Sequence, residues 1–133
     1  MAINFNNALG TYEAALKLRT QRAEILSANL ANADTPNYKA RDIDFHKALQ
    51  SQLTMQRESS ITSTQSGHDQ SAWKTMSGPE LLYRTPSQPS IDGNTVDENI
   101  EHAEFMSNSM EFQVAFTLLN SRFRGLMSAI KGD

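Results

Sequence analysis

Three histidines, His46, His68 and His102, are the side chains of this sequence best suited to bind a metal or to move a proton. None of them has another histidine or a cysteine at the spacing that metal ligands need. Glu98 and His102 stand four residues apart, and such a pair on a helix usually makes only a weak surface contact. We therefore interpret the histidines as solvated surface residues, and we predict neither a metal nor another cofactor.

Two aspartates in "RDIDF" are the nearest approach to a pair of catalytic carboxylates. In an extended segment Asp42 and Asp44 share one face while Ile43 and Phe45 share the other, which is typical of a half-buried strand. Serines are abundant, but the sequence has no G-x-S-x-G turn and no glycine-rich phosphate loop. The residues that could do chemistry therefore give no positive indication of an enzyme.

The composition excludes further classes of function. Twelve Lys and Arg against fifteen Asp and Glu give a net charge of −3, which is too balanced for a protein that binds phosphate backbones. The chain has no cysteine, so disulfides and thiolate metal sites are excluded. No apolar run approaches the roughly 20 residues that span a bilayer, and the start lacks the features of a cleavable secretion signal. We expect no nucleic-acid partner and no membrane insertion, and any export would need another route.

The elements that must position these side chains are two long helices at the ends of the chain. Alternating steps of four and three residues from Phe5 to Leu30 meet an apolar or aromatic residue at seven of eight positions, and so do the same steps from Phe105 to Ile130. Such a repeat is typical of a coiled-coil seam. We predict an N-terminal helix over residues 1–33 and a C-terminal helix over residues 95–133.

Capping and turn residues indicate where these helices begin and end. Thr95 followed by Glu98 predicts a capping box for the C-terminal helix, directly after a "DG" turn. The N-terminal helix should end near Ala33, because Thr35 precedes Pro36 and is pushed out of helical dihedrals. The polar residues of "NAD", at 32–34, tolerate the turn or left-handed conformations that follow.

The sequence between the helices is different in character. We predict a turn and an extended segment over residues 34–45, and a variable, loop-rich middle over residues 46–94. Phe45, Leu49 and Leu53 recur at helical spacing and predict a short helix over about residues 45–56. The later "ELLYRTPSQPSIDG" predicts one extended piece whose prolines exclude a central strand.

The predicted fold is mainly α: an elongated pair of long, coiled-coil-like N- and C-terminal helices with a short, irregular or extended central segment. A helix over residues 96–131 would be on the order of 54 Å long. A compact globule of this size is only about 36 Å across. The helix cannot be enclosed, so the molecule must be elongated.

Each long helix also has a second apolar face. Leu18 and Ile25 lie on it in the first helix, and Met110, Val114 and Leu118 in the last. A lone helical hairpin buries one side only, and each large side chain left in water forfeits about 1.5–3 kcal/mol. Either the middle segment folds back over these faces or other copies of the protein cover them.

The stretch "ILSANLANADTPNYKARDIDF", residues 25–45, resembles the N-terminal signature of the bacterial flagellar rod and hook protein family. The matching positions are Ser27, Asn29, Ala31, Asn32, Thr35, Pro36 and Tyr38. Within that family the chain is similar to the proximal rod members, because it is short and carries "ARDIDF" and "LLYRTPSQPSIDGNTVD" on either side of its middle. The final helix lacks the Gln-Arg-x-[Tyr/Phe] pattern of the distal rod and hook members.

The resemblance implies a structural, non-enzymatic subunit of the basal body rod, which spans the periplasm and transmits torque in motility. It implies helical assembly through the terminal helices, with other copies, adjacent rod and basal body proteins and a membrane-ring adaptor as partners. It also implies export by the flagellar type III apparatus without a cleavable signal. The residues alone leave open an alternative: a small helical adaptor or export chaperone that offers its spare apolar face to a client helix.

Assembly through the terminal helices predicts an interface made by their apolar faces and by the signature turn. The candidate residues are Leu9, Leu16, Leu18, Ile25, Leu26, Leu30, Asn32, Pro36, Tyr38, Phe105, Met110, Phe112, Val114, Phe116, Leu118, Leu119 and Phe123. We expect the break after the first helix to direct the chain onto a neighbouring subunit, with Tyr38 as a buried contact. A turn within one chain is the alternative.

Overall fold

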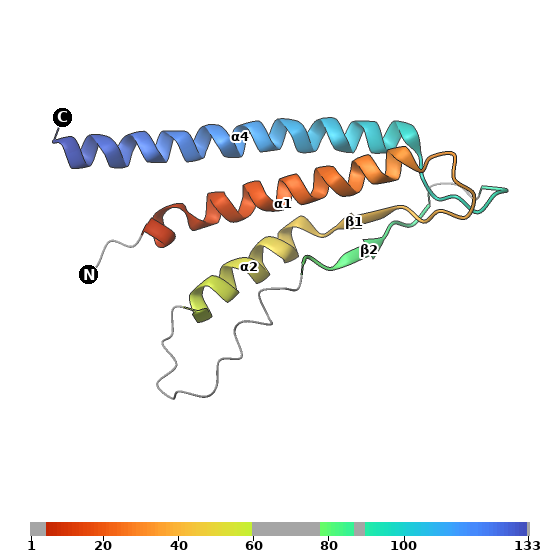
Figure 1. Ribbon diagram of the computed structural model, residues 1–133, viewed down its shortest axis with the longest axis horizontal. Helices are drawn as coiled ribbons and strands as arrows, with labels where there is room; N and C mark the ends of the chain where they lie inside the picture. The colour runs from red at the N-terminus through yellow and green to blue at the C-terminus, as the bar shows by residue number, and fades with distance from the viewer. Residues whose placement is uncertain (1–4, 60–77, 87–89, 133) are drawn as a thin grey trace.

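The computed structural model describes residues 5–59, 78–86 and 90–132. In this part of the chain the elements follow in the order α1 (Phe5–Ala31), β1 (Arg41–Ile43), α2 (Phe45–Ser59), β2 (Leu81–Tyr83) and α4 (Glu98–Lys131). The long helices α1 and α4 lie side by side, and α2 and the two strands lie on the other side of α1 (Figure 1). The prediction of an elongated, mainly α fold with paired terminal helices is confirmed.

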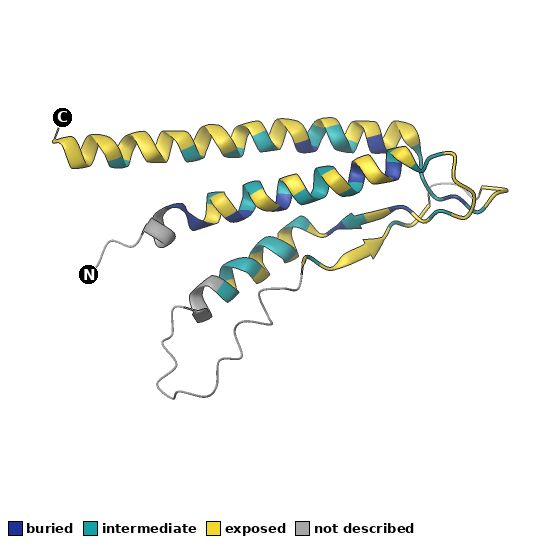
Figure 2. Ribbon diagram, viewed as in Figure 1, coloured by how far each residue is buried: buried dark blue, intermediate teal, exposed yellow. Residues whose placement is uncertain are grey.

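The central helix is α1, because it packs against α4 on one side and against α2 and β1 on the other. Leu18 and Leu26 of α1 are completely buried, and Leu9 and Ala14 nearly so (Figure 2). The sequence pattern placed Leu18 on a second apolar face and left open whether the middle segment or other copies cover that face. Leu18 is buried within the chain, and α2 and β1 pack against α1, so this leucine needs no second copy to cover it.

The contact row on α4 differs from the predicted seam. Its buried and half-buried positions include Glu101, Phe105, Asn108, Phe112, Ala115 and Leu119, which alternate in steps of four and three residues, and Leu126 follows seven residues later. Phe116 and Phe123, which the prediction put in the seam, are exposed instead. The pattern of apolar residues selected the neighbouring row because Glu101 and Asn108, which occupy the true row, are polar.

The N-cap of α4 is Asp97 and not Thr95 as predicted. The Asp97 carboxylate accepts hydrogen bonds from the backbone N–H groups of Asn99 and Ile100, which have no acceptor inside the helix. The Thr95 hydroxyl accepts a hydrogen bond from the backbone N–H of Ala40 at 2.8 Å. Thr95 is therefore occupied by the signature segment and is unavailable to cap the helix.

The signature turn is held against the residues that precede α4. The helix α1 ends at Ala31, two residues before the predicted end. The left-handed residue is Asn37, with φ of 62°, and its N–H donates to the Asp92 carbonyl at 2.9 Å. Gly93 faces it with φ of 74°, and a Cβ there would lie 2.6 Å from the Asn37 Oδ1. A side chain at Gly93 would need the positive φ and would push the Asn37 side chain aside, which favours glycine in this "DG" turn. The turn is confirmed, and the left-handed position lies outside residues 32–34.

The two strands form a small antiparallel sheet in which Asp42 pairs with Leu82. Ile43 is buried and Asp44 is exposed, as the alternation in "RDIDF" predicts. Phe45 opens α2 instead of extending the strand, and α2 runs three residues beyond its predicted end. The prolines of the later segment follow β2 and leave the pairing intact.

Some sequence predictions fall outside the described part of the chain. These are the contact of Phe5 in the seam and the loop-rich character of residues 60–77. Within the described residues, no helix combines the length and the apolar character that a bilayer crossing needs.

Candidate assembly surface and the polar cluster behind it

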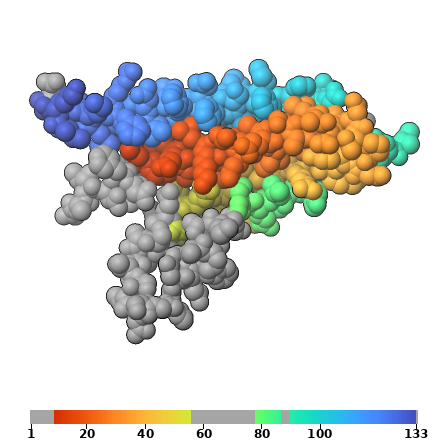
Figure 3. All heavy atoms as spheres, in the orientation of Figure 1, coloured from red at the N-terminus to blue at the C-terminus, as the bar shows by residue number. Residues whose placement is uncertain are grey.

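Most exposed large apolar side chains among the described residues lie on α4. They are Ile100, Met106, Met110, Val114, Phe116, Leu118, Phe123, Met127 and Ile130. The helix forms one long edge of the molecule and is exposed along almost its whole length (Figures 2 and 3). An exposed apolar surface of this extent marks an interaction site.

Six of these side chains form two patches that point in different directions. We call Met106, Met110 and Val114 the outer patch, because at 100° per residue they lie about 170° around α4 from its contact row with α1. We call Phe116, Phe123 and Met127 the flank patch, because they lie only about 70° from that row. The six side chains are between 46% and 64% exposed. The surface is therefore two-sided.

The structure divides the predicted interface residues into three groups. Leu9, Leu18 and Leu26 are buried within the chain; Leu16, Ile25, Leu30, Asn32, Tyr38, Phe105, Phe112 and Leu119 are half-buried; Pro36, Met110, Val114, Phe116, Leu118 and Phe123 are exposed. The first group belongs to the intrachain core and presents no surface to a partner. The exposed members on α4 lie together, while Pro36 lies in the signature turn beyond the end of α1.

Asn29, one of the signature residues, organises the turn from inside. Its Nδ2 donates to the Arg41 carbonyl at 2.7 Å and to Glu101 Oε2 at 3.1 Å. Its Oδ1 accepts from the Arg41 N–H at 3.1 Å and from the Tyr38 hydroxyl at 3.2 Å. Asn29 is completely buried and has all its amide groups satisfied. It joins α1, the signature segment and α4.

An ion-pair cluster lies beside Asn29. Arg22 binds both oxygens of Asp42 at 2.9 Å and also reaches Glu104 at 2.8 Å. Arg84, just after β2, donates to Asp42 and to Glu101. Burial alone would raise the pKa of Asp42, but hydrogen bonds from Arg22 and Arg84 outweigh it and leave the pKa below its usual value. The hydrogen bond to Asp42 raises the pKa of Arg22 against the effect of burial. The cluster ties α1, the sheet and α4 together.

A second polar contact joins the helices further along. Asn108 of α4 donates to the backbone carbonyl of Arg19 at 2.9 Å, and the Arg19 guanidinium pairs with Glu111. The same guanidinium lies 3.6 Å from the centre of the Phe45 ring, so it also holds α2. Burial is the main cause of the lowered pKa of Arg19, although Glu111 counteracts it. Arg19 was the one polar residue in the predicted seam of the N-terminal helix, and it connects three helices.

Asn94 closes the signature turn from the other side. Its Nδ2 donates to the carbonyls of Asn32 and Thr35, each at 3.1 Å, and to that of Ala33. The backbone N–H of Thr95 donates to the Tyr38 carbonyl at 3.0 Å. In the described chain the turn therefore has intrachain partners, and Tyr38 is half-buried by them. The contact of this segment with a neighbouring subunit stays a prediction.

The search for a seam did not find Glu101, Glu104 and Asn108, because it followed apolar positions only. The signal that could have found them is the row through Phe105, Phe112 and Leu119, which shares its 4–3 spacing with Glu101 and Asn108. A charged or amide side chain at a seam position needs a polar partner on the facing helix. Arg19, Arg22 and Asn29 all lie on α1 within reach of such a row.

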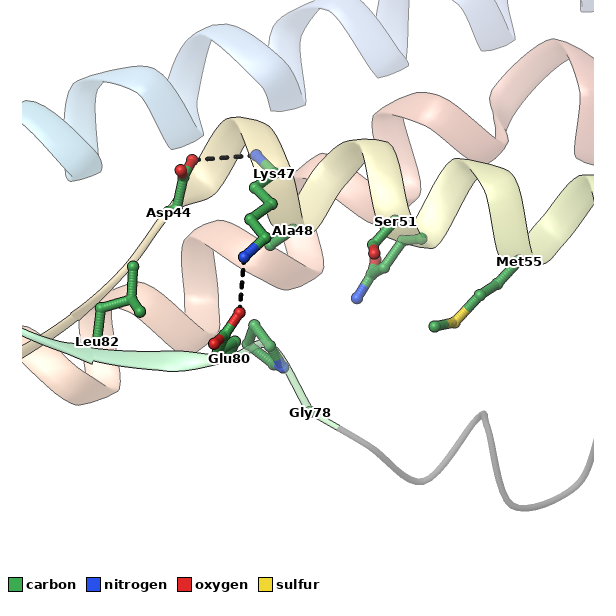
Figure 4. A pocket seen from close by; sticks show the side chains of 10 residues that line it. Asp44, Lys47, Ala48, Ser51, Met55, Gly78, Glu80 and Leu82 are labelled. Carbon is green, nitrogen blue, oxygen red and sulfur yellow. Dashed lines mark hydrogen bonds and ion pairs between the residues drawn. The ribbon is translucent and has the colours of Figure 1, made fainter.

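A shallow hollow of about 200 Å³ lies between α2 and β2. Figure 4 shows its polar side chains engaged with one another: Lys47 reaches Glu80 at 2.8 Å, and its backbone N–H donates to Asp44. The pairing with Glu80 is the main cause that raises the pKa of Lys47. In the described part of the chain, no group of three or more acidic or histidine side chains is placed to hold a metal. The assembly surface on α4 is thus the stronger candidate.

Comparison with known proteins agrees with the resemblance. Residues 9–39 match the family described as flagella basal body rod protein. The chain is 45% identical over 129 residues to flagellar basal body rod protein FlgB of Salmonella typhimurium, which covers 94% of each chain. It is 43% identical over 134 residues to FlgB of Aeromonas hydrophila, with 100% of this chain and 99% of the relative covered. It is 41% identical over 128 residues to FlgB of Escherichia coli, with 93% of each covered. With such identity over almost the full length, the chain belongs to the FlgB family of flagellar basal body rod proteins.

Proposed function

We propose that the chain is a structural subunit of the rod, that it enters the rod through α1 and α4, and that it catalyses no reaction. The observation that supports this most directly is the exposed apolar surface of α4, which carries large apolar side chains on two faces, the outer patch and the flank patch, besides the row that packs against α1. Exposed apolar surface of this extent marks a site that another protein covers.

The energetic argument follows from the exposed side chains. Full burial of each large apolar side chain of α4 contributes about 1.5–3 kcal/mol. The burial of several of them by a partner therefore offsets much of the free energy that association loses in translational and rotational freedom. The client-binding adaptor that the sequence left open would need the same surface. Membership of a basal body rod family favours copies of the chain and neighbouring rod proteins as the partners.

We extend the proposal to location and route. The chain lies in the basal body rod across the periplasm, next to other rod subunits and a membrane-ring adaptor, and transmits torque with them. It reaches this place unfolded, through the flagellar type III export apparatus. The small apolar core of Leu9, Ala14, Leu18, Leu26 and Ile43, with Ala40, is consistent with a chain that unfolds at low cost.

The four segments expected from the sequence receive separate roles in this proposal. Residues 1–33 and 95–133 assemble, and residues 34–45 lock the two helices together at one end. Residues 46–94 form the variable middle, of which α2 packs against α1, and this middle is not required for contacts along the rod.

The test is incorporation. In the bacterium that encodes the chain, its gene is deleted and replaced by an epitope-tagged copy, and basal bodies are purified. We expect the deletion to abolish swimming and the tagged chain to restore it and to co-purify with the rod. Complete basal bodies that lack the tag, with the chain in a soluble complex, would favour the adaptor instead.

A further inference from the structure

We infer that the polar contacts between α1 and α4 act as a rotational restraint, which holds α4 away from the rotation in which its most apolar row would face α1. Phe116 and Phe123 stay on the surface as a result. The inference concerns the isolated chain. It goes beyond the proposed function, because it states what keeps these two side chains out of the chain's own helix pair.

The first step is that α4 carries two rows that could face α1. At 100° per residue, the centres of the two rows differ by only about 30° around the helix. The row that faces α1 contains Glu101, Asn108 and Ala115. The unused row contains Phe116 and Phe123 instead, so burial of apolar surface by itself favours the unused row.

The second step is the position of the polar contacts on α4. Four polar side chains of α4 bind Asn29, Arg22 and Arg19 of α1. Their centre lies roughly 90° around α4 from the centre of Phe116 and Phe123. A rotation that turned the two phenylalanines toward α1 would therefore carry all four polar side chains away from their partners. The four are Glu101, Glu104, Asn108 and Glu111.

The third step is the burial of these contacts. Glu101 and Asn108 are 1% and 2% exposed, so neither has water as a substitute for its partner on α1. A buried polar group that loses its partner is costly to the fold. In coiled coils, a single buried asparagine in the seam selects one pairing of the helices at a cost in stability. The polar contacts therefore decide the rotation of α4 against the apolar preference.

The absence of cysteine allows single thiols to report the rotation of α4. Ala115→Cys places a thiol on the row that faces α1, where the position is half-buried, and Ser109→Cys places one on the unused row, where the position is exposed. Each is made in the unmodified chain and in a release variant that combines Arg19→Met with Asn108→Ala. The rate of reaction with a thiol reagent is measured on the isolated full chain.

We expect the release variant to react severalfold faster at residue 115 and more slowly at residue 109, because the rotation turns one position outward and the other toward α1. Opposite changes separate a rotation from a looser helix pair. A looser pair would raise both rates and would overturn the inference. Two unchanged rates would overturn it as well, because apolar packing would then fix the rotation of α4 without the polar contacts.

The matched control is Lys47→Met, which breaks an exposed ion pair and should change neither rate. If the release variant loses its helical circular dichroism signal, Asn108→Ala is measured alone, since Arg19 then keeps its contacts with Glu111 and Phe45. The same opposite changes are expected, and the same two outcomes would overturn the inference. These rates are measured without a rod, so their failure would leave the proposed function standing.

Discussion

Arg84 Nη1 lies 2.7 Å from Glu101 Oε1, and this ion pair joins the end of β2 to the first turn of α4. Glu101 is only 1% exposed, so its carboxylate depends on the protein for every hydrogen bond. A buried charge that loses its partner costs more than the pair itself contributes. The position of the sheet relative to α4 is therefore fixed by an electrostatic contact.

We predict that Arg84→Met lowers the free energy of unfolding by about 3 kcal/mol, because it leaves the buried carboxylate of Glu101 without its ion-pair partner and removes one partner of Asp42. Urea unfolding followed by circular dichroism measures the change. The matched control is Lys47→Met, which breaks the exposed pair with Glu80 and should leave the unfolding midpoint almost unchanged. Equal midpoints for the two variants would show that the buried pair is not a structural contact.

We predict that Asn29→Leu destabilises the chain far more than Tyr38→Phe. Leucine fills a similar volume but leaves the Arg41 N–H and carbonyl without the amide partners that hold them, at a cost of about 1–3 kcal/mol for each buried group. Tyr38→Phe removes one hydrogen bond, worth about 1 kcal/mol. Thermal and urea unfolding of both variants checks the order. A silent Asn29→Leu would mean that this signature position is kept for assembly alone.

The sequence predicted the elements well because each has a local cause. The heptad-like repeats give α1 and α4, the alternation in "RDIDF" gives β1, and Gly93 gives the turn before α4. Phe45, Leu49 and Leu53 likewise mark α2. These features depend on residues close in sequence, where spacing and dihedral preference decide the outcome.

The pairing of faces could not be predicted in the same way. The choice between the rows through Phe116 and through Asn108 depends on Arg19, which lies 89 residues from Asn108 in sequence. Thr95 lies at a position whose sequence favours an N-cap, but its hydroxyl accepts a hydrogen bond from the Ala40 backbone N–H instead. Long-range polar contacts of this kind override local preference. The exposure of Met110, Val114 and Leu118 was predictable, since the spacing of these residues places them on the second apolar face of the helix.

We predict that acid weakens the fold through Asp42. Its folded pKa lies below the usual 3.8, so on acidification the unfolded chain binds the proton first. The stabilisation is complete above about pH 4, declines below it and is lost once the pH falls through the folded pKa. Asp42→Asn should therefore be less stable than the unmodified chain at neutral pH, and the gap should narrow near about pH 3. Urea unfolding at both pH values tests this, and a constant gap would exclude Asp42 as the titrating group.

We predict different failures for two substitutions that the sequence alone treats as equivalent. Leu26→Asp places a carboxylate at a position with no exposure, so the isolated chain should lose its helical circular dichroism signal. Phe116→Asp adds its charge at a position that is 51% exposed, so the isolated chain should keep its fold and its unfolding midpoint.

Both substitutions should abolish swimming in soft agar, because Leu26→Asp gives no folded subunit and Phe116→Asp puts a charge in the flank patch. Gln50→Asp, on the exposed side of α2, should swim normally. Normal swimming by Phe116→Asp cells would show that the flank patch stays in water in the assembled rod, and the exposed apolar side chains of α4 would then need another explanation.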